Sequence, residues 1–144
     1  MPTRSLVLPG TLAALEPLGE FVHAAAREAG FDRHAAYRLH LAVDEVATNT
    51  VTHGYEERGI KGELYLSAEI DPAALRIHLE DTGAPYDPTQ RADPKDLDKP
   101  LEERGVGGLG IFLAKRNVDA FLYERRGDRN RVTFVLHRGA SRSG

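Results

Sequence analysis

The chain has 144 residues, of which 41% are hydrophobic, so it carries enough apolar material for one compact domain with its own core. Its 19 basic and 22 acidic residues are scattered and give a net charge of −3, which provides no electrostatic footprint for a nucleic-acid partner. The absence of cysteine excludes disulfides and thiolate metal sites, and no apolar run reaches the roughly 18 residues that a membrane span requires.

The first 30 residues predict a strand and then a helix. RSLVLP is short and apolar and is followed by Gly10, which is typical of a strand at about residues 4 to 8. Thr11 is the predicted N-cap of a helix whose apolar residues recur at steps of three and four until Gly30. The N-terminus lacks the long apolar region and cleavage site of a secretion signal, so we expect a cytoplasmic protein.

The next segment predicts a second helix and a hairpin. Asp32 is the expected cap of a helix over about residues 33 to 53, and Gly54 is expected to close it. Residues 62 to 70 and 74 to 81 then alternate between apolar and polar side chains and are joined by a short proline turn. This pattern predicts two antiparallel strands.

The last third of the chain predicts a long loop, a helix and a closing hairpin. Residues 83 to 108 contain four prolines and four glycines, and a loop of this length in a compact domain is usually functional or disordered. Helical spacing resumes over 109 to 119, and 120 to 126 and 131 to 138 are expected to pair around the turn GDRN. With no internal repeat or linker, we expect a single domain.

The order of these elements predicts the fold class. Adjacent strands are joined mostly by short turns, so the sheet should be mixed and mostly antiparallel. Three helices should cover one of its faces. The expected architecture is a two-layer α/β (α+β) sandwich.

The second helix contains a regular polar series, Glu45, Asn49 and His53, within an otherwise apolar pattern. Residues four apart are neighbours on a helix, so Glu45 and Asn49 present a carboxylate and an amide side by side. Such a pair in isolation is more often an ordinary helix surface than a site. His53 is interpreted as fastening the end of the helix rather than as a functional group.

Two further segments have ligand-binding character. In EDTGAP, Asp81 ends a strand and Gly83 follows, so a fixed acceptor lies beside backbone that a flat ligand can approach closely. The alternative is a plain turn. In GVGGLGI, residues 105 to 111, glycines precede a helix start whose free N–H groups attract phosphate. The alternative there is a flexible linker.

The three segments, in this order, resemble the GHKL (Bergerat-fold) ATP-binding superfamily. More narrowly, the chain is similar to the stand-alone anti-sigma factor serine/threonine kinases of bacterial partner-switching systems. DEVATNTVTHGY matches their N box, EDTGAPYDP their first glycine box, GVGGLGIFLAKRNVD their second, and NRVTFVLHR their last strand. The resemblance runs over nearly the whole chain, from RSLVLPG to about Arg138.

The resemblance implies roles for residues that would contact ATP and Mg²⁺. Glu45 would be the general base that accepts the proton of an attacking serine or threonine hydroxyl. Asn49 would hold Mg²⁺ through its side-chain oxygen. Asp81 would bind the adenine amine, Gly83 would leave space for the base, and Thr133 would join the adenine network through water.

The same resemblance implies how the phosphates and the protein partners are bound. Residues 88 to 107 would form an ATP lid, and Arg104 would reach the γ-phosphate. The phosphates would be enclosed by the glycines of the second box, Gly105, Gly107, Gly108 and Gly110. The implied partners are a sigma factor and its STAS-type antagonist, which the kinase would phosphorylate. Dimerisation is common in the family, although the sequence shows no self-complementary patch, so a homodimer is left open.

Other functions remain open from the sequence. The main alternative is an ATP-binding switch or interaction module that uses ATP as a structural ligand without physiological kinase turnover. A detached histidine-kinase catalytic domain is less favoured, because the chain opens with a strand and its N box has the form D-E-x-x-x-N. Gyrase-like or chaperone-like ATPases would need a transducer domain, for which the chain has no length.

Overall fold

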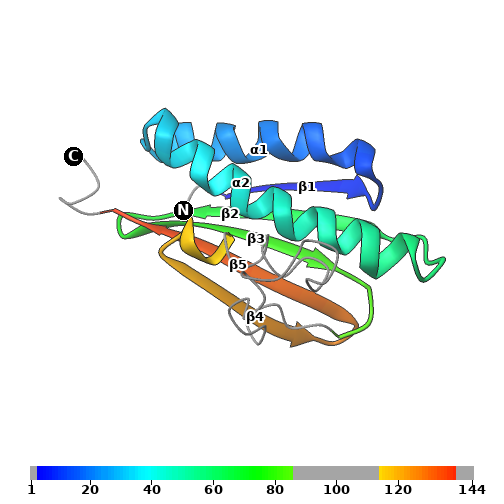
Figure 1. The fold of residues 1–144 in the computed structure, drawn as a ribbon. Coiled ribbons are helices and arrows are strands. Elements are labelled where there is room, and N and C mark those ends of the chain that lie inside the picture. The colour runs from blue at the N-terminus through cyan, green and yellow to red at the C-terminus, as the bar shows by residue number, and fades with distance from the viewer. Residues whose placement is uncertain (1–2, 86–113, 139–144) are drawn as a thin grey trace, which may run out of the picture.

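The computed structural model describes residues 3–85 and 114–138. Two long helices lie across one face of a five-stranded sheet, as Figure 1 shows. The helices are α1 (Leu15–Glu28) and α2 (Arg33–Asn49), with a short 3₁₀ helix η1 (Leu12–Ala14) before α1 and a π-helix η2 (Thr50–Glu56) after α2. The strands are β1 (Thr3–Pro9), β2 (Glu63–Ile70), β3 (Ala74–Asp81), β4 (Ala120–Arg126) and β5 (Arg129–His137).

The sheet has the order β1-β2-β3-β5-β4, and every strand pair among the described residues is antiparallel. The sequence predicted a mixed, mostly antiparallel sheet, whereas the described strands form no parallel pair. The two-layer α+β architecture is confirmed. The order also places β3 at the centre, so the strand that ends in Asp81 is flanked by β2 and β5.

Buried and exposed side chains alternate along the strands, and the buried ones form the sheet side of the core. Leu64, Leu66 and Ala68 of β2 are buried, whereas Glu63 and Glu69 on the other face are exposed. The apolar stripes of the two helices pack onto this face. The largest fully buried side chains are Tyr55, Phe134, Leu18, Leu39, Leu64, Leu66, Leu75, Ile77, Leu79, Leu136 and Val22.

The helix starts agree with the sequence in one case and differ in the other. The carboxylate of Asp32 accepts a hydrogen bond from the backbone N–H of Ala35 at 2.8 Å, so the predicted cap of α2 is confirmed. Thr11 makes no side-chain cap, and the chain enters α1 through the 3₁₀ turn instead. Gly30 has φ +88° and ends the α1 segment as expected.

The end of α2 differs from the prediction. Gly54 does not close the helix, because the regular α-helix ends at Asn49 and continues as the π-helix η2 through Gly54 to Glu56. The left-handed glycine that follows is Gly59, with φ +66°. The wider helical turns of η2 therefore begin directly after Asn49, and π-helical turns are often found at functional sites.

The closing hairpin is tighter than predicted. Its turn consists of Gly127, with φ +61°, and Asp128, so Arg129 and Asn130 belong to β5 rather than to a four-residue turn. Residues 86–113, which hold most of the predicted loop and the start of the helix expected at 109 to 119, lie outside the described residues. From that helix the structure describes a helical stretch at 114–116, where Ala114 is buried.

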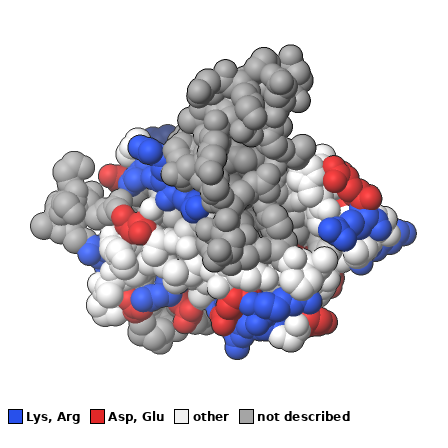
Figure 2. All heavy atoms as spheres, turned by 60° about the horizontal axis from the view of Figure 1, so that its bottom comes forward, with Lys and Arg blue, Asp and Glu red and all other residues white. Residues whose placement is uncertain are grey.

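The surface carries charges of both signs. On the face drawn in Figure 2, acidic and basic side chains are interspersed around apolar and polar surface. Within the described part of the chain, no helix is both long and apolar enough to cross a bilayer.

Replacing Phe134 by alanine should cost about 3–5 kcal/mol of the free energy of unfolding, because a large aromatic side chain is lost from a filled core. Phe134 is fully buried and stacks on Phe121 with ring centroids 5.4 Å apart. Leu122→Ala on the neighbouring strand is the control, since Leu122 is 55% exposed and should cost well under about 1 kcal/mol. Urea unfolding of both variants measures the difference, and equal costs would contradict this account of the core.

Candidate functional site

Glu45 and Asn49 lie one helical turn apart near the C-terminal end of α2. Both side chains are partly exposed, while Val46 and Ala47 between them are buried against the sheet. The carboxylate and the amide therefore border the buried stripe of the helix and remain accessible from one side. This local arrangement agrees with the predicted polar pair.

The backbone beyond Asn49 meets the turn after β3. A Cβ on Gly83 would come within 3.7 Å of the carbonyl oxygen of Gly54 and 4.0 Å of its Cα. The end of the helical segment that carries Glu45 and Asn49 thus lies against the D-x-G turn. Two segments that the sequence singled out separately are brought together by this close approach of two glycines.

Asp81 is the last residue of β3, and its side chain is buried, with 8% of the residue exposed. Its Oδ1 accepts hydrogen bonds from the backbone N–H of Gly83 at 2.8 Å and from Nδ2 of Asn130 at 2.9 Å. Within the described residues, Oδ2 has no hydrogen-bond partner. The carboxylate is therefore held by one oxygen, and the other remains able to accept a hydrogen bond from a ligand.

Burial raises the pKa of the Asp81 carboxyl above its ordinary value, because the charged form loses solvation. The hydrogen bonds from Asn130 and Gly83 and the nearby charge of Arg125 act in the opposite direction and favour the ionised form. Arg125 itself donates to the carbonyl oxygen of Gly83 at 2.8 Å. The surroundings thus keep a buried acceptor in a fixed orientation.

Asn130 is a site residue that the sequence reasoning missed. It is 3% exposed, and its Nδ2 donates to both Asp81 and the carbonyl oxygen of Ala84, the latter at 2.9 Å. The hydroxyl of Tyr123 donates to its Oδ1 at 2.6 Å, which sets the orientation of the amide. Asn130 is also the direct cross-strand partner of Asp81 in the sheet register.

Thr133 is not where the resemblance implied, and this prediction is corrected. It pairs with His78 rather than with Asp81, and its Oγ1 lies 2.8 Å from the His78 Nδ1. Side chains alternate across a strand, so Asn130 and Thr133, three positions apart, point to opposite faces. Thr133 faces away from the helices, on the side of the sheet opposite Asp81.

The structure provides no geometry for the remaining predicted site residues. Gly105, Gly107, Gly108, Gly110 and Arg104, and the lid expected at 88 to 107, lie outside the described residues. No cluster of three or more histidine, cysteine, aspartate or glutamate side chains suited to a metal occurs in the described ranges. Asn49 supplies one amide oxygen, and a single protein ligand is compatible with Mg²⁺, which keeps water and phosphate oxygens around it.

His53 behaves as the sequence suggested. Its Nδ1 lies 2.8 Å from the Oε2 of Glu57, four residues later, in an exposed pair. This contact fastens the last turns of η2. It directs the ring away from Asn49 and toward the end of the helix.

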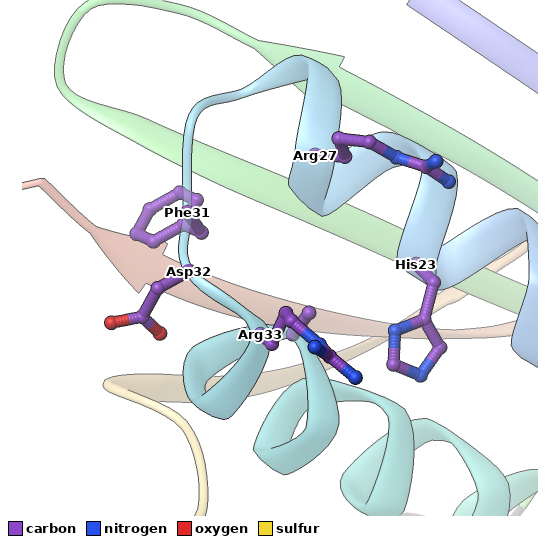
Figure 3. Close-up of a pocket in the computed structure, with 6 residues that line it drawn as sticks. His23, Arg27, Phe31, Asp32 and Arg33 are labelled. Carbon is purple, nitrogen blue, oxygen red and sulfur yellow. The ribbon is translucent and has the colours of Figure 1, made fainter.

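A groove of about 320 Å³ lies elsewhere, between α1 and the start of α2. Figure 3 shows His23 from α1 and Arg33 from α2 reaching toward one another, with Phe31 and Asp32 on the connection between the helices. None of the predicted nucleotide-binding residues lines it. This groove therefore belongs to the surface of the helical layer and not to the site around Asp81.

Comparison with known proteins decides the family. Residues 8–136 match the model of the histidine kinase-like ATPase domain. The chain belongs to this family. The match covers the helix that carries Glu45 and Asn49, the Asp81 turn and the closing hairpin, so the segments joined in the structure all fall within the family domain.

Relatives within the family bear kinase names. The chain is 32% identical to the serine/threonine-protein kinase BtrW of Bordetella bronchiseptica over 101 residues, which is 70% of each chain. It is 32% identical to the serine-protein kinase RsbW of Listeria monocytogenes over 97 residues, 65% of this chain and 61% of that protein. Within the family, the chain groups with these RsbW- and BtrW-type kinases.

Solved structures show the same fold. A crystal structure of the RsbU and RsbW domains of a Mycobacterium tuberculosis protein superimposes with a TM-score of 0.65 at 18% identity. The superposition covers 97% of this chain and 34% of that one. A blue-light activated histidine kinase of Erythrobacter litoralis gives a TM-score of 0.53 at 21% identity, over 86% of this chain and 40% of that one. At these identities the likeness concerns the fold alone.

Asn130→Ala should weaken Mg-ATP binding about tenfold at neutral pH and make it more sensitive to acid, since a hydrogen bond to a charged group is lost. Asn130 favours the ionised form of Asp81, so its removal raises the pKa of that carboxyl further. As the pH falls, Asp81 then becomes protonated earlier, and affinity should be lost at a higher pH than in the wild type.

Calorimetric titrations with Mg-ATP at several pH values test the Asn130 prediction. Tyr123→Phe is the control, since it removes the hydroxyl that orients Asn130 but leaves the Asn130–Asp81 hydrogen bond in place, and a smaller effect is expected. An affinity loss in Asn130→Ala that is identical at every pH would show that the pKa of Asp81 is not involved.

Proposed function

We propose that this protein is an ATP-dependent protein serine/threonine kinase and anti-sigma factor, which phosphorylates a STAS-type antagonist in a partner-switching system. The observation that carries the proposal is the close approach of Gly54 to Gly83, which brings the Glu45–Asn49 helix against the Asp81 turn. An acid for proton transfer, an amide for a metal and a buried acceptor for a base then border one region. The kinase names of the BtrW and RsbW relatives support the same reaction.

The proposed reaction is a single transfer of the γ-phosphoryl group. The Glu45 carboxylate accepts the proton of a serine or threonine hydroxyl on the antagonist while that oxygen forms a bond to the γ-phosphorus of ATP. The bond between the γ-phosphorus and its bridging oxygen breaks, and ADP leaves. Mg²⁺, held by Asn49, would neutralise charge on the phosphates. Positioning and electrostatic stabilisation supply most of the rate in such transfers.

Asp81 and Asn130 would set the orientation of the nucleotide. Oδ2 of Asp81, which has no hydrogen-bond partner among the described residues, would accept a hydrogen bond from the exocyclic amine of adenine, and Gly83 would leave space for the ring. In the second glycine box, Gly105, Gly107, Gly108 and Gly110 would enclose the phosphates, with Arg104 at the γ-phosphate. Residues 88 to 107 are proposed as the lid of a single ATPase domain.

The proposed partners are proteins, a sigma factor and its antagonist, in the cytoplasm, where ATP is available. The net charge of −3 argues against a nucleic-acid partner. The kinase would hold the sigma factor and release it when the antagonist competes for the kinase. Phosphorylation of the antagonist would end that competition.

Co-purification from the native cell, followed by a phosphotransfer assay, tests this function. A STAS-type protein should be recovered with the kinase and should gain label on serine or threonine from γ-labelled Mg-ATP. A sigma factor should be recovered in a separate complex. Recovery of such partners without any transfer of label would favour the alternative of an ATP-dependent binding module.

A further inference from the structure

Tyr55 lies at the junction of three segments that border the proposed site. Its ring is 1% exposed, in the π-helix η2, and packs on the backbone of two glycines. A Cβ on Gly10 or on Gly62 would come within 2.6 Å of ring carbons of Tyr55. The ring therefore occupies a slot that exists only because both neighbours lack side chains.

The Tyr55 hydroxyl makes hydrogen bonds to two different strand ends. It donates to the carbonyl oxygen of Glu63 at 2.8 Å, at the start of β2, and accepts from the backbone N–H of Thr82 at 2.9 Å. Thr82 lies between Asp81 and Gly83, immediately after β3. One hydroxyl thus connects the helical segment that follows Asn49 to the turn that presents the buried acid.

The hydrogen bond between Tyr55 and Thr82 affects the binding of any ligand that contacts both the Asp81 turn and α2. A nucleotide gains binding energy from Asp81 at its base and from the Mg²⁺ ligand Asn49 at its phosphates only when these two ends of the site have the correct separation. A displacement of about 1 Å can cost a hundredfold in a precisely arranged site. The helical backbone runs without a break from Asn49 to Tyr55, so the hydrogen bond between Tyr55 and Thr82 directly links the two ends of the site.

We propose that Tyr55 is a positioning residue, which holds the base-binding acid Asp81 at a fixed distance from the phosphate-binding face of α2. This inference rests on the proposed function and adds to it a residue that contacts no ligand atom. Its signature is loss of affinity for a nucleotide that bridges both ends of the site, in a protein that remains folded.

The first test is Tyr55→Phe, which keeps the ring in its slot and removes the hydroxyl. The dissociation constant for Mg-ATP, measured by calorimetry well below the unfolding temperature of the variant, should rise about tenfold, as expected for a lost positioning hydrogen bond. Tyr65→Phe is the matched control. The Tyr65 hydroxyl contacts the Glu63 carboxylate at 3.2 Å on the exposed side of β2, and its removal should leave affinity unchanged.

The second variant, Thr82→Pro, removes the hydrogen bond from the Thr82 N–H and the 3.3 Å contact between the Thr82 and Tyr55 hydroxyls. It leaves Tyr55 and its hydrogen bond to Glu63 in place. Asp81 has strand geometry, which suits a residue before proline, and the Thr82 N–H donates to Tyr55 rather than to a neighbouring strand. Thr82→Pro should weaken Mg-ATP binding as much as Tyr55→Phe does. The double variant should be no weaker than Tyr55→Phe alone, because both changes break the link between Tyr55 and Thr82, and only Tyr55→Phe also removes the hydrogen bond to Glu63.

The outcomes separate this inference from the proposed function. Wild-type affinity in folded Tyr55→Phe and Thr82→Pro, or additive losses in the double variant, would overturn the positioning role and leave the kinase proposal intact. If Tyr55→Phe does not fold, Thr82→Pro decides the question alone. A wild-type protein that does not bind Mg-ATP would refute the proposed function and this inference with it.

Discussion

Glu45→Gln is expected to lose phosphoryl transfer by a factor of roughly 10²–10⁴, the range that a positioned general base contributes. Glutamine has the size and shape of glutamate but cannot take up the proton of the attacking hydroxyl. The change lies one helical turn from Asn49, so Mg-ATP binding should stay within about twofold of the wild type. Single-turnover transfer to the antagonist, with calorimetric binding of Mg-ATP alongside, measures both quantities.

Two control variants define what the Glu45 result means. Glu56→Gln changes an exposed acid further along the same helical segment and should leave transfer unchanged. Asn49→Ala should lower Mg-ATP affinity whether the protein is a kinase or a binding module, so it cannot separate the two functions. Glu45→Gln separates them: a variant that transfers phosphate as the wild type does would refute the role of general base.

The fold could be predicted from the sequence where the signals are local. Alternation in β2 and β3 and the cap at Asp32 depend on neighbours within a few positions, and both are confirmed. The end of α2 could not be predicted in this way. Gly54 has the composition of a helix stop, but Tyr55 must reach its slot between Gly10 and Gly62, and this long-range packing accompanies continuation of the helix past Gly54.

In the candidate site, too, local features could be predicted from the sequence and long-range contacts could not. The adjacency of Glu45 and Asn49 follows from helical spacing, whereas their proximity to the Asp81 turn depends on the contact between Gly54 and Gly83. Thr133 was wrongly assigned to the adenine network because its hydroxyl was matched to a hydroxyl position on the last strand of the family.

A period-two count could have found the missing residue. The buried positions of β5 that face the helices are Leu136, Phe134, Val132 and Asn130, and such a count back from Phe134 places Asn130 rather than Thr133 beside Asp81. The turn GDRN concealed this, because its asparagine resembles a turn residue.

Asp81→Asn should weaken Mg-ATP binding by at least about a hundredfold, because a charged acceptor is replaced by a donor at the position that we propose faces the adenine amine. An asparagine can still accept from the Gly83 N–H and from Asn130 through its Oδ1. The substitution therefore changes only the other terminal atom of the side chain, from the Oδ2 of the carboxylate to the Nδ2 of the amide. Glu80→Gln is the control, since Glu80 precedes Asp81 in β3 and pairs with Arg129 and Arg131 on the opposite face.

The same variant should unfold at an equal or higher temperature than the wild type in the absence of nucleotide. Burial raises the pKa of Asp81 in the folded protein, so its ionised form costs stability at neutral pH, and this cost is relieved as the pH falls through the raised pKa. A neutral amide removes the cost at every pH. Calorimetric binding and thermal unfolding of the apoprotein measure the two effects. Lost affinity with retained stability identifies Asp81 as an acid kept for ligand binding, whereas unchanged Mg-ATP affinity would show that no base is bound there.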